Sequence, residues 1–217
     1  YLGYSMKIYS MLPAIISGGI SLSIFPLLSI YVVENNISKI KETMSKGIRL
    51  LFFVSIPIVF VFLLFGHPII NLLFVRGAFT NYDALQISRL LSVYILALPI
   101  AVIGEVIAKG YYIFQDTKTP VILGAIEMIV YFAAAYILLP KFRLLAIPIA
   151  FVIYYFSSII NAFIVRKKLG GKGGKKIIVS FYKHTLSGFI VFGIVYMPIF
   201  KIDNLLVQNI LIFSSII

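Results

Sequence analysis

The chain has 217 residues, of which 61% are hydrophobic and 12% are charged, and its formal net charge is +12. A water-soluble domain carries about 25% charged residues, so this composition excludes an ordinary soluble domain. The sequence contains no cysteine, which excludes a disulfide framework, a thiolate metal site and a cysteine nucleophile.

The apolar residues form blocks that are long enough to cross a bilayer, which takes about 20 residues. Met11 to Val33 is 23 residues without a charge, and Leu50 to Val75 is 26. We therefore predict an all-α membrane protein, a polytopic bundle of about seven transmembrane helices, because lipid offers the backbone no hydrogen-bond partners. The predicted spans are roughly 8–33, 50–75, 90–108, 121–140, 144–165, 184–200 and 204–217, the last cut short.

The segments between these spans carry an uneven share of the basic residues. If the spans alternate in direction, segments 34–49, 109–120 and 166–183 share one side and hold thirteen basic residues, whereas the opposite segments hold five. An excess of lysine and arginine marks the cytoplasmic side of a membrane protein. We therefore predict that these three segments are cytoplasmic, and that the net charge reflects topology rather than nucleic-acid binding.

The pattern of spans and basic segments predicts that the chain is divided into three parts. Residues 1–165 form a core of about five spans, 166–183 form a basic cytoplasmic linker, and 184–217 form two further spans. Thr119 and Pro120 predict the start of the fourth span, as an N-cap residue followed by proline at the first helical position. Because the chain starts at Tyr1 and stops inside an apolar run, we expect it to be part of a longer protein.

Three ionisable residues lie in or at the edge of apolar spans: Lys7, Glu105 and Glu127. Charge inside a bilayer costs about 2.5–3.5 kcal/mol on insertion scales, so such residues usually face a cavity or a partner. Glu127 is either an interhelical hydrogen-bonded carboxyl or an ion- or proton-coupling site. Glu105 either couples to an ion or reaches the interface. Lys7 either faces a cavity or extends to the outer interface.

Enzymatic chemistry has no support in the sequence. We find no serine elbow, no metal-binding cluster and no carboxylate pair suited to hydrolysis, so the chain is predicted to be a non-enzyme without a cofactor or catalytic residue. The glycine- and lysine-rich stretch 170–176 lacks the Gly-Lys-Ser/Thr ending of a phosphate-binding loop. It is better interpreted as a basic linker that contacts anionic membrane lipid.

Two motifs and the first span carry a family resemblance. The sequence reads LFVRGAFT over 73–80, followed by Asp83-Ala84, and later Gly110-Tyr111-Tyr112 followed by QDTKTP over 115–120. This pairing closely resembles the MurJ (MviN) family of lipid II flippases, in the wider superfamily of multidrug, oligosaccharidyl-lipid and polysaccharide exporters. The first span, with Leu12-Pro13, Gly18-Gly19 and FPLLS over 25–29, is similar to the family's eighth span.

The resemblance implies the eighth to fourteenth spans of a 14-span protein, one lobe of a two-lobe transporter that alternates its access. It implies flipping of an undecaprenyl-pyrophosphate-linked sugar-peptide, the lipid II precursor of peptidoglycan, across the bacterial cytoplasmic membrane. The missing N-terminal lobe and membrane lipids would be its partners. Sodium, protons or the membrane potential would supply the drive.

The resemblance also implies roles for single residues. Lys7 and Ile8 stand where family members often carry an acidic–arginine pair, so Lys7 is expected to contact the anionic substrate, without arginine's bidentate fork. The motif residues Gly77, Phe79, Asp83, Asp116 and Pro120 are expected to be structural, with a tight turn at Gly77 and a loop braced by Asp116. A polysaccharide-lipid flippase and a cation-coupled multidrug exporter of the same superfamily remain alternative functions.

Overall fold

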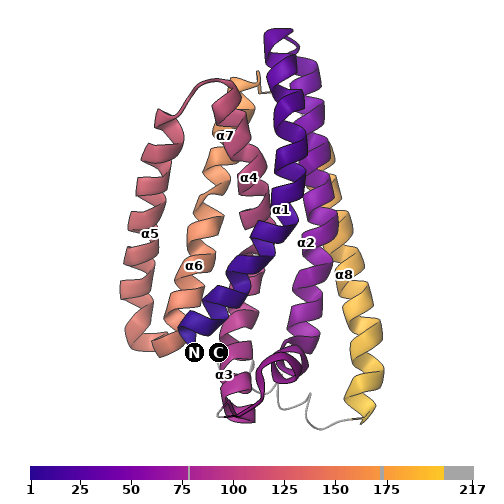
Figure 1. Cartoon of the computed structure of the whole chain (residues 1–217), viewed down its shortest axis with the longest axis vertical. Coiled ribbons are helices and arrows are strands. Elements are labelled where there is room, and N and C mark those ends of the chain that lie inside the picture. The colour runs from indigo at the N-terminus through magenta and orange to yellow at the C-terminus, as the bar shows by residue number, and fades with distance from the viewer. Residues whose placement is uncertain (78, 172–173, 203–217) are drawn as a thin grey trace.

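The computed structural model describes residues 1–77, 79–171 and 174–202, and within these ranges every regular element is helical (Figure 1). The all-α prediction is therefore confirmed. The helices are α1 (Leu2–Val33), α2 (Ile37–Phe74), α3 (Asn81–Tyr94), α4 (Leu98–Ile113), α5 (Lys118–Phe142), α6 (Ala146–Ser157), α7 (Ile159–Lys168) and α8 (Lys175–Ile202), with 3-10 turns η1 (Ile95–Ala97) and η2 (Arg143–Leu145).

Four helical stretches of the described chain are long and apolar enough to cross a membrane: Ile37–Phe74, Asn81–Ile113, Lys118–Lys168 and Lys175–Val195. The two parts of α1 make a fifth if they are counted as one bent span. The 51-residue stretch from Lys118 would be about 76 Å long if straight, far more than a bilayer core. It turns back at Arg143, where φ is +49°, so α5 and α6 run side by side as two passes (Figure 1).

The expected count of about seven spans is therefore approximate. Six passes lie in the described ranges, and the predicted span 204–217 falls outside them. The predicted linker 166–183 is shorter in the structure, because α7 continues to Lys168 and α8 begins at Lys175.

A bend in α1 and a break in the third span each lie about four residues before a proline, which lacks the N–H that would bond to the carbonyl four residues earlier. The two parts of α1, Leu2–Ile20 and Leu22–Val33, are bent by 44°, and Pro26 lies four residues after Leu22. Likewise, η1 interrupts the third span four residues before Pro99. The third span thus consists of α3, η1 and α4.

The three basic segments meet at one end of the bundle, shown at the top of Figure 1. This end carries the α1–α2, α4–α5 and α7–α8 connections, and direct contacts link them. Lys168 forms an ion pair with Asp116, and the Lys41 ammonium lies beside Gly170. Spans that alternate in direction require these three segments to share one side of the membrane. In the structure, the three segments do lie together.

The core lies where α1, α2, α3 and α4 pack together, and it contains fully buried Leu28, Ile40, Leu51 and Val102. Gly110 of α4 permits a close approach there. A Cβ at this position would lie 2.8 Å from Cε of Met44 and 3.0 Å from Cγ1 of Val165.

The remaining helices flank this core. α8 lies along α2 (Figure 1), and aromatic rings join the two helices, with centroids 5.2 Å apart for Phe52 and Phe181 and 5.1 Å apart for Phe60 and Phe189. On the other side, α5 is the outermost helix and packs mainly on α6.

Candidate functional site

A buried carboxyl marks the contact of α5 with the rest of the bundle. Among the residues of α5, only Glu127 is buried, with 8% of its surface exposed. The Asn161 side chain of α7 donates a hydrogen bond from Nδ2 to Oε1 of Glu127 over 2.6 Å. The Tyr111 hydroxyl of α4 donates in turn to Oδ1 of Asn161 over 3.1 Å. These three polar side chains therefore connect α4, α5 and α7.

The Glu127 carboxyl has no cationic partner in the described part of the chain, where its recorded partner is Asn161. A buried carboxylate without a countercharge is costly, so such a group either takes up a proton or holds a cation. The described residues contain no group of three or more His, Cys, Asp or Glu side chains suited to a metal ion. The groups that could bind a proton or a cation at this site are thus one carboxyl, one amide and one hydroxyl.

A second polar contact braces the loop between α4 and α5. Asp116 forms an ion pair with Lys168 and accepts a hydrogen bond from the Thr119 backbone N–H over 3.0 Å. The bonds donated by Lys168 and Thr119 hold the pKa of the Asp116 carboxyl well below its usual range. The Lys168 ammonium also lies 5.6 Å from the centre of the Tyr111 ring. The Asp116–Lys168 contact therefore adjoins the Glu127 network through Tyr111.

The start of α5 differs from the expectation. The helix begins at Lys118 rather than at Pro120, and the N-cap position belongs to Thr117, whose side chain makes no capping bond. Asp116 satisfies the backbone N–H of Thr119 instead. Pro120 lies in the first turn, where its missing N–H leaves no helical bond unmade.

The other motif shapes the turn before α3, at the end opposite the basic segments. Gly77 has a φ of +61°, in the left-handed region that favours glycine. Thr80 and Asp83 form a reciprocal capping box, and the Tyr1 hydroxyl donates to Oδ1 of Asp83 over 2.9 Å. The Phe79 ring lies 6.1 Å from that of Phe74 and 6.3 Å from that of Tyr4, between centroids.

Lys7 and Glu105 lie apart from the Glu127 network. Lys7 is exposed on α1, whereas its neighbours Ser5 and Tyr9 are buried. Glu105 is exposed on α4, and no hydrogen bond or ion pair of either side chain is recorded within the described ranges. The structure therefore does not bring the three predicted ionisable residues into one contact.

The partners of Glu127 and Asp116 were not singled out from the sequence. Asn161 is an isolated amide inside the apolar run 144–165, which is a usable signal because polar side chains in membrane helices commonly bond to another helix. Lys168 has no comparable signal, since it is one of several lysines and arginines in its segment. Only the packing of α7 against α4 selects it.

Comparison with known proteins identifies consistent relatives. A family model described as "Lipid II flippase MurJ" matches residues 1–215. A "Probable lipid II flippase MurJ" of Vibrio cholerae is 35% identical over 129 residues, which is 59% of this chain and 25% of that protein. A protein of Rickettsia prowazekii with the same description is 28% identical over 129 residues, which is again 59% of this chain and 25% of that protein.

A solved structure titled "Lipid II flippase MurJ, inward closed conformation" shares the fold, with a TM-score of 0.78 at 22% identity. The match covers 100% of this chain and 44% of the solved one. The chain therefore spans less than half of the length of these relatives.

Proposed function

The chain belongs to the MurJ lipid II flippase family, and from this membership we propose that it forms one lobe of a transporter. The transporter moves an undecaprenyl-pyrophosphate-linked sugar-peptide, lipid II, from the inner to the outer leaflet of the bacterial cytoplasmic membrane. The family match over residues 1–215 is the observation that carries this proposal. The missing N-terminal lobe completes the transporter.

The physical task explains what such a lobe must offer. A pyrophosphate and sugar head group cannot enter hydrocarbon without losing its hydration, so it needs a wet path lined by compensating charge. Lys7 is exposed on a face of α1 that this chain leaves uncovered, together with Met11 and Ala14 one and two turns later. In our proposal this face borders the path between the lobes, and Lys7 contacts the pyrophosphate as a point charge.

Glu127 is the proposed coupling residue. Its carboxyl lies where α4, α5 and α7 are joined through Asn161 and Tyr111. Binding of a sodium ion or a proton would change the charge at this junction, and so would favour one arrangement of the three helices over another. Glu105 is the second candidate, because it is exposed on α4. No resident cofactor or catalytic step is part of the proposal.

The proposed orientation follows from the charges. Segments 34–49, 109–120 and 166–183 hold thirteen basic residues in the sequence, and the end of the bundle where their described parts meet is assigned to the cytoplasm.

Complementation tests the proposal. A bacterium is depleted of its own lipid II flippase and given the complete gene that encodes this chain, and growth and outer-leaflet lipid II are measured. We expect rescue by the wild type, and loss of rescue with Lys7→Ala or Glu127→Ala. The matched controls, Lys141→Ala and Glu34→Gln, remove exposed charges elsewhere and should rescue fully.

Each outcome has a distinct meaning. No rescue despite membrane expression would overturn the flippase proposal and favour a polysaccharide-lipid flippase or a cation-coupled exporter. Rescue that survives both Lys7→Ala and Glu127→Ala would keep the transport function but remove the two assigned roles. A scaffold without transport activity would restore no outer-leaflet lipid II, whether or not these charges are present.

A further inference from the structure

A large pocket opens at the basic end of the bundle, away from the Glu127 network. It has a volume of about 1260 Å³ and is lined by α2, α4, α7 and α8. Pockets for small molecules are usually about 300–1,000 Å³, so this space is larger than a free ion or a compact metabolite requires. Neither Lys7 nor Glu105 nor Glu127 lines it.

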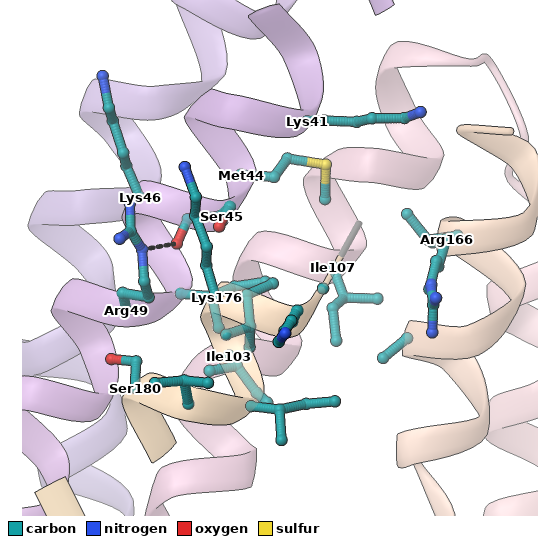
Figure 2. Close-up of a pocket in the computed structure, with 18 of the residues that line it drawn as sticks. Lys41, Met44, Ser45, Lys46, Arg49, Ile103, Ile107, Arg166, Lys176 and Ser180 are labelled. Atoms are coloured by element: carbon teal, nitrogen blue, oxygen red, sulfur yellow. Dashed lines mark hydrogen bonds between the residues drawn. The ribbon is translucent and has the colours of Figure 1, made fainter. Parts of the chain in front are cut away.

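The pocket wall carries an excess of positive charge. Seven basic residues line it: Lys41, Lys46, Arg49, Arg166, Lys175, Lys176 and Lys183. Glu42 is the acidic residue of the lining, and it is paired with Lys46 at 2.8 Å. Figure 2 shows basic side chains from three helices, with Lys46, Arg49 and Lys176 on one side, Arg166 on the other and Lys41 above. Like charges that line one pocket repel one another, and the single charge of Glu42, which Lys46, Lys176 and Arg49 share, offsets only part of this excess, so a further anion between them would be stabilised.

The floor of the pocket is apolar, and so are parts of its α7 and α8 walls. Met44, Ile103 and Ile107 lie between the basic side chains in Figure 2. Phe163 of α7 and Ile178 of α8 line the pocket and remain 61% and 54% exposed. A free phosphate or nucleotide needs no such apolar surface, whereas an acyl chain does. The pocket therefore combines an anion site with an adjoining apolar face.

The position in the fold matches this chemistry. Lys41, Arg166 and Lys176 stand within two turns of the helix ends at the basic end, where lipid head groups lie, and Ile107 and Ile103 of α4 lie farther from that end. Basic pockets between transmembrane helices on the cytoplasmic side are sites for anionic lipid head groups. We propose that this pocket binds one anionic phospholipid, with its phosphate between Lys176 on one side and Lys41 and Arg166 on the other, and its acyl chain along Phe163 and Ile178. The bound lipid fills the space between α7 and α8.

A binding assay on the purified product of the complete gene, in neutral detergent, tests this site without any transport. Native mass spectrometry compares phosphatidylglycerol with phosphatidylcholine of the same acyl chains, and glycerol phosphate supplies the head group alone. We expect tighter binding of phosphatidylglycerol, and a loss of roughly thirty-fold in Lys41→Ala/Lys176→Ala, since each lysine near a membrane surface contributes about five-fold. The control, Lys118→Ala/Lys167→Ala, removes two exposed lysines at the same end but outside the pocket.

Three results would overturn the proposal. Equal binding of the two lipids would show that charge is not recognised. Equal loss in the pocket variant and its control would show that only overall charge matters. Displacement of the lipid by glycerol phosphate at an equal concentration would assign the pocket to a soluble phosphate compound. Ile178→Ser tests the apolar part of the pocket. This variant should bind phosphatidylglycerol more weakly and bind glycerol phosphate as the wild type does. Circular dichroism verifies that each variant is folded, and failure of the flippase proposal would leave these results intact.

Discussion

Replacing Asn161 with alanine tests whether its amide holds three helices together. The change removes the hydrogen bond to Glu127 at 2.6 Å and the one from Tyr111 at 3.1 Å. Interhelical hydrogen bonds in membrane proteins contribute about 0.6 kcal/mol on average and about 1.7 at most. The Tyr111 hydroxyl keeps the Asn161 backbone carbonyl, 3.3 Å away, as an acceptor. The expected loss is therefore roughly 1–2 kcal/mol, most of it because a buried Glu127 loses its donor. Unfolding by dodecyl sulfate in mixed micelles, followed by circular dichroism, measures this loss.

A double-mutant cycle with Glu127→Ala isolates the pair. The coupling energy between Asn161→Ala and Glu127→Ala should be about 0.6–1.7 kcal/mol. Asn81→Ala is the matched control, because the Asn81 side chain is exposed and its bond with Asn71 faces solvent or head groups, so the expected loss is under about 0.5 kcal/mol. A coupling below about 0.3 kcal/mol, or equal losses for Asn161→Ala and Asn81→Ala, would refute the reasoning.

Two further predictions concern the α2–α8 contact and the α4–α5 loop. The ring of Phe60 occupies the position that a Cβ on Gly188 would take, so Gly188→Leu should destabilise the protein by about 1–3 kcal/mol. Gly193→Leu is the control, because a Cβ there meets open space, and it should leave the stability unchanged. Equal melting temperatures for the two variants would contradict this. The depressed pKa of Asp116 means that its contact with Lys168 stabilises the fold above the ordinary carboxyl pKa of about 4 and is lost as pH falls through the lower folded value. The difference in melting temperature between wild type and Asp116→Asn should therefore stay constant down to about pH 4 and narrow below it, and narrowing already near pH 6 would argue against the contact.

The sequence determined the class of the protein because the bilayer permits few solutions. Long uncharged runs such as 11–33 and 50–75 must be helices in lipid, and the alternating direction of successive spans required three of the connecting segments on one side. The observed bundle agrees on both points. Element ends were less predictable: α8 begins at Lys175 although lysines there suggested a linker, because packing against α2 extends the helix.

Only the tertiary structure decided which polar residues act together. The sequence singled out Glu127 as an isolated carboxyl in an apolar span, and it was packing that placed Asn161, 34 residues away, against it. Lys168 and Asp116 are 52 residues apart, and nothing in a run of lysines and arginines distinguishes the one that forms the ion pair. The lipid pocket likewise needs α2 and α8 side by side. Periodicity and composition act along one helix, whereas pair formation depends on how helices far apart in the chain are packed.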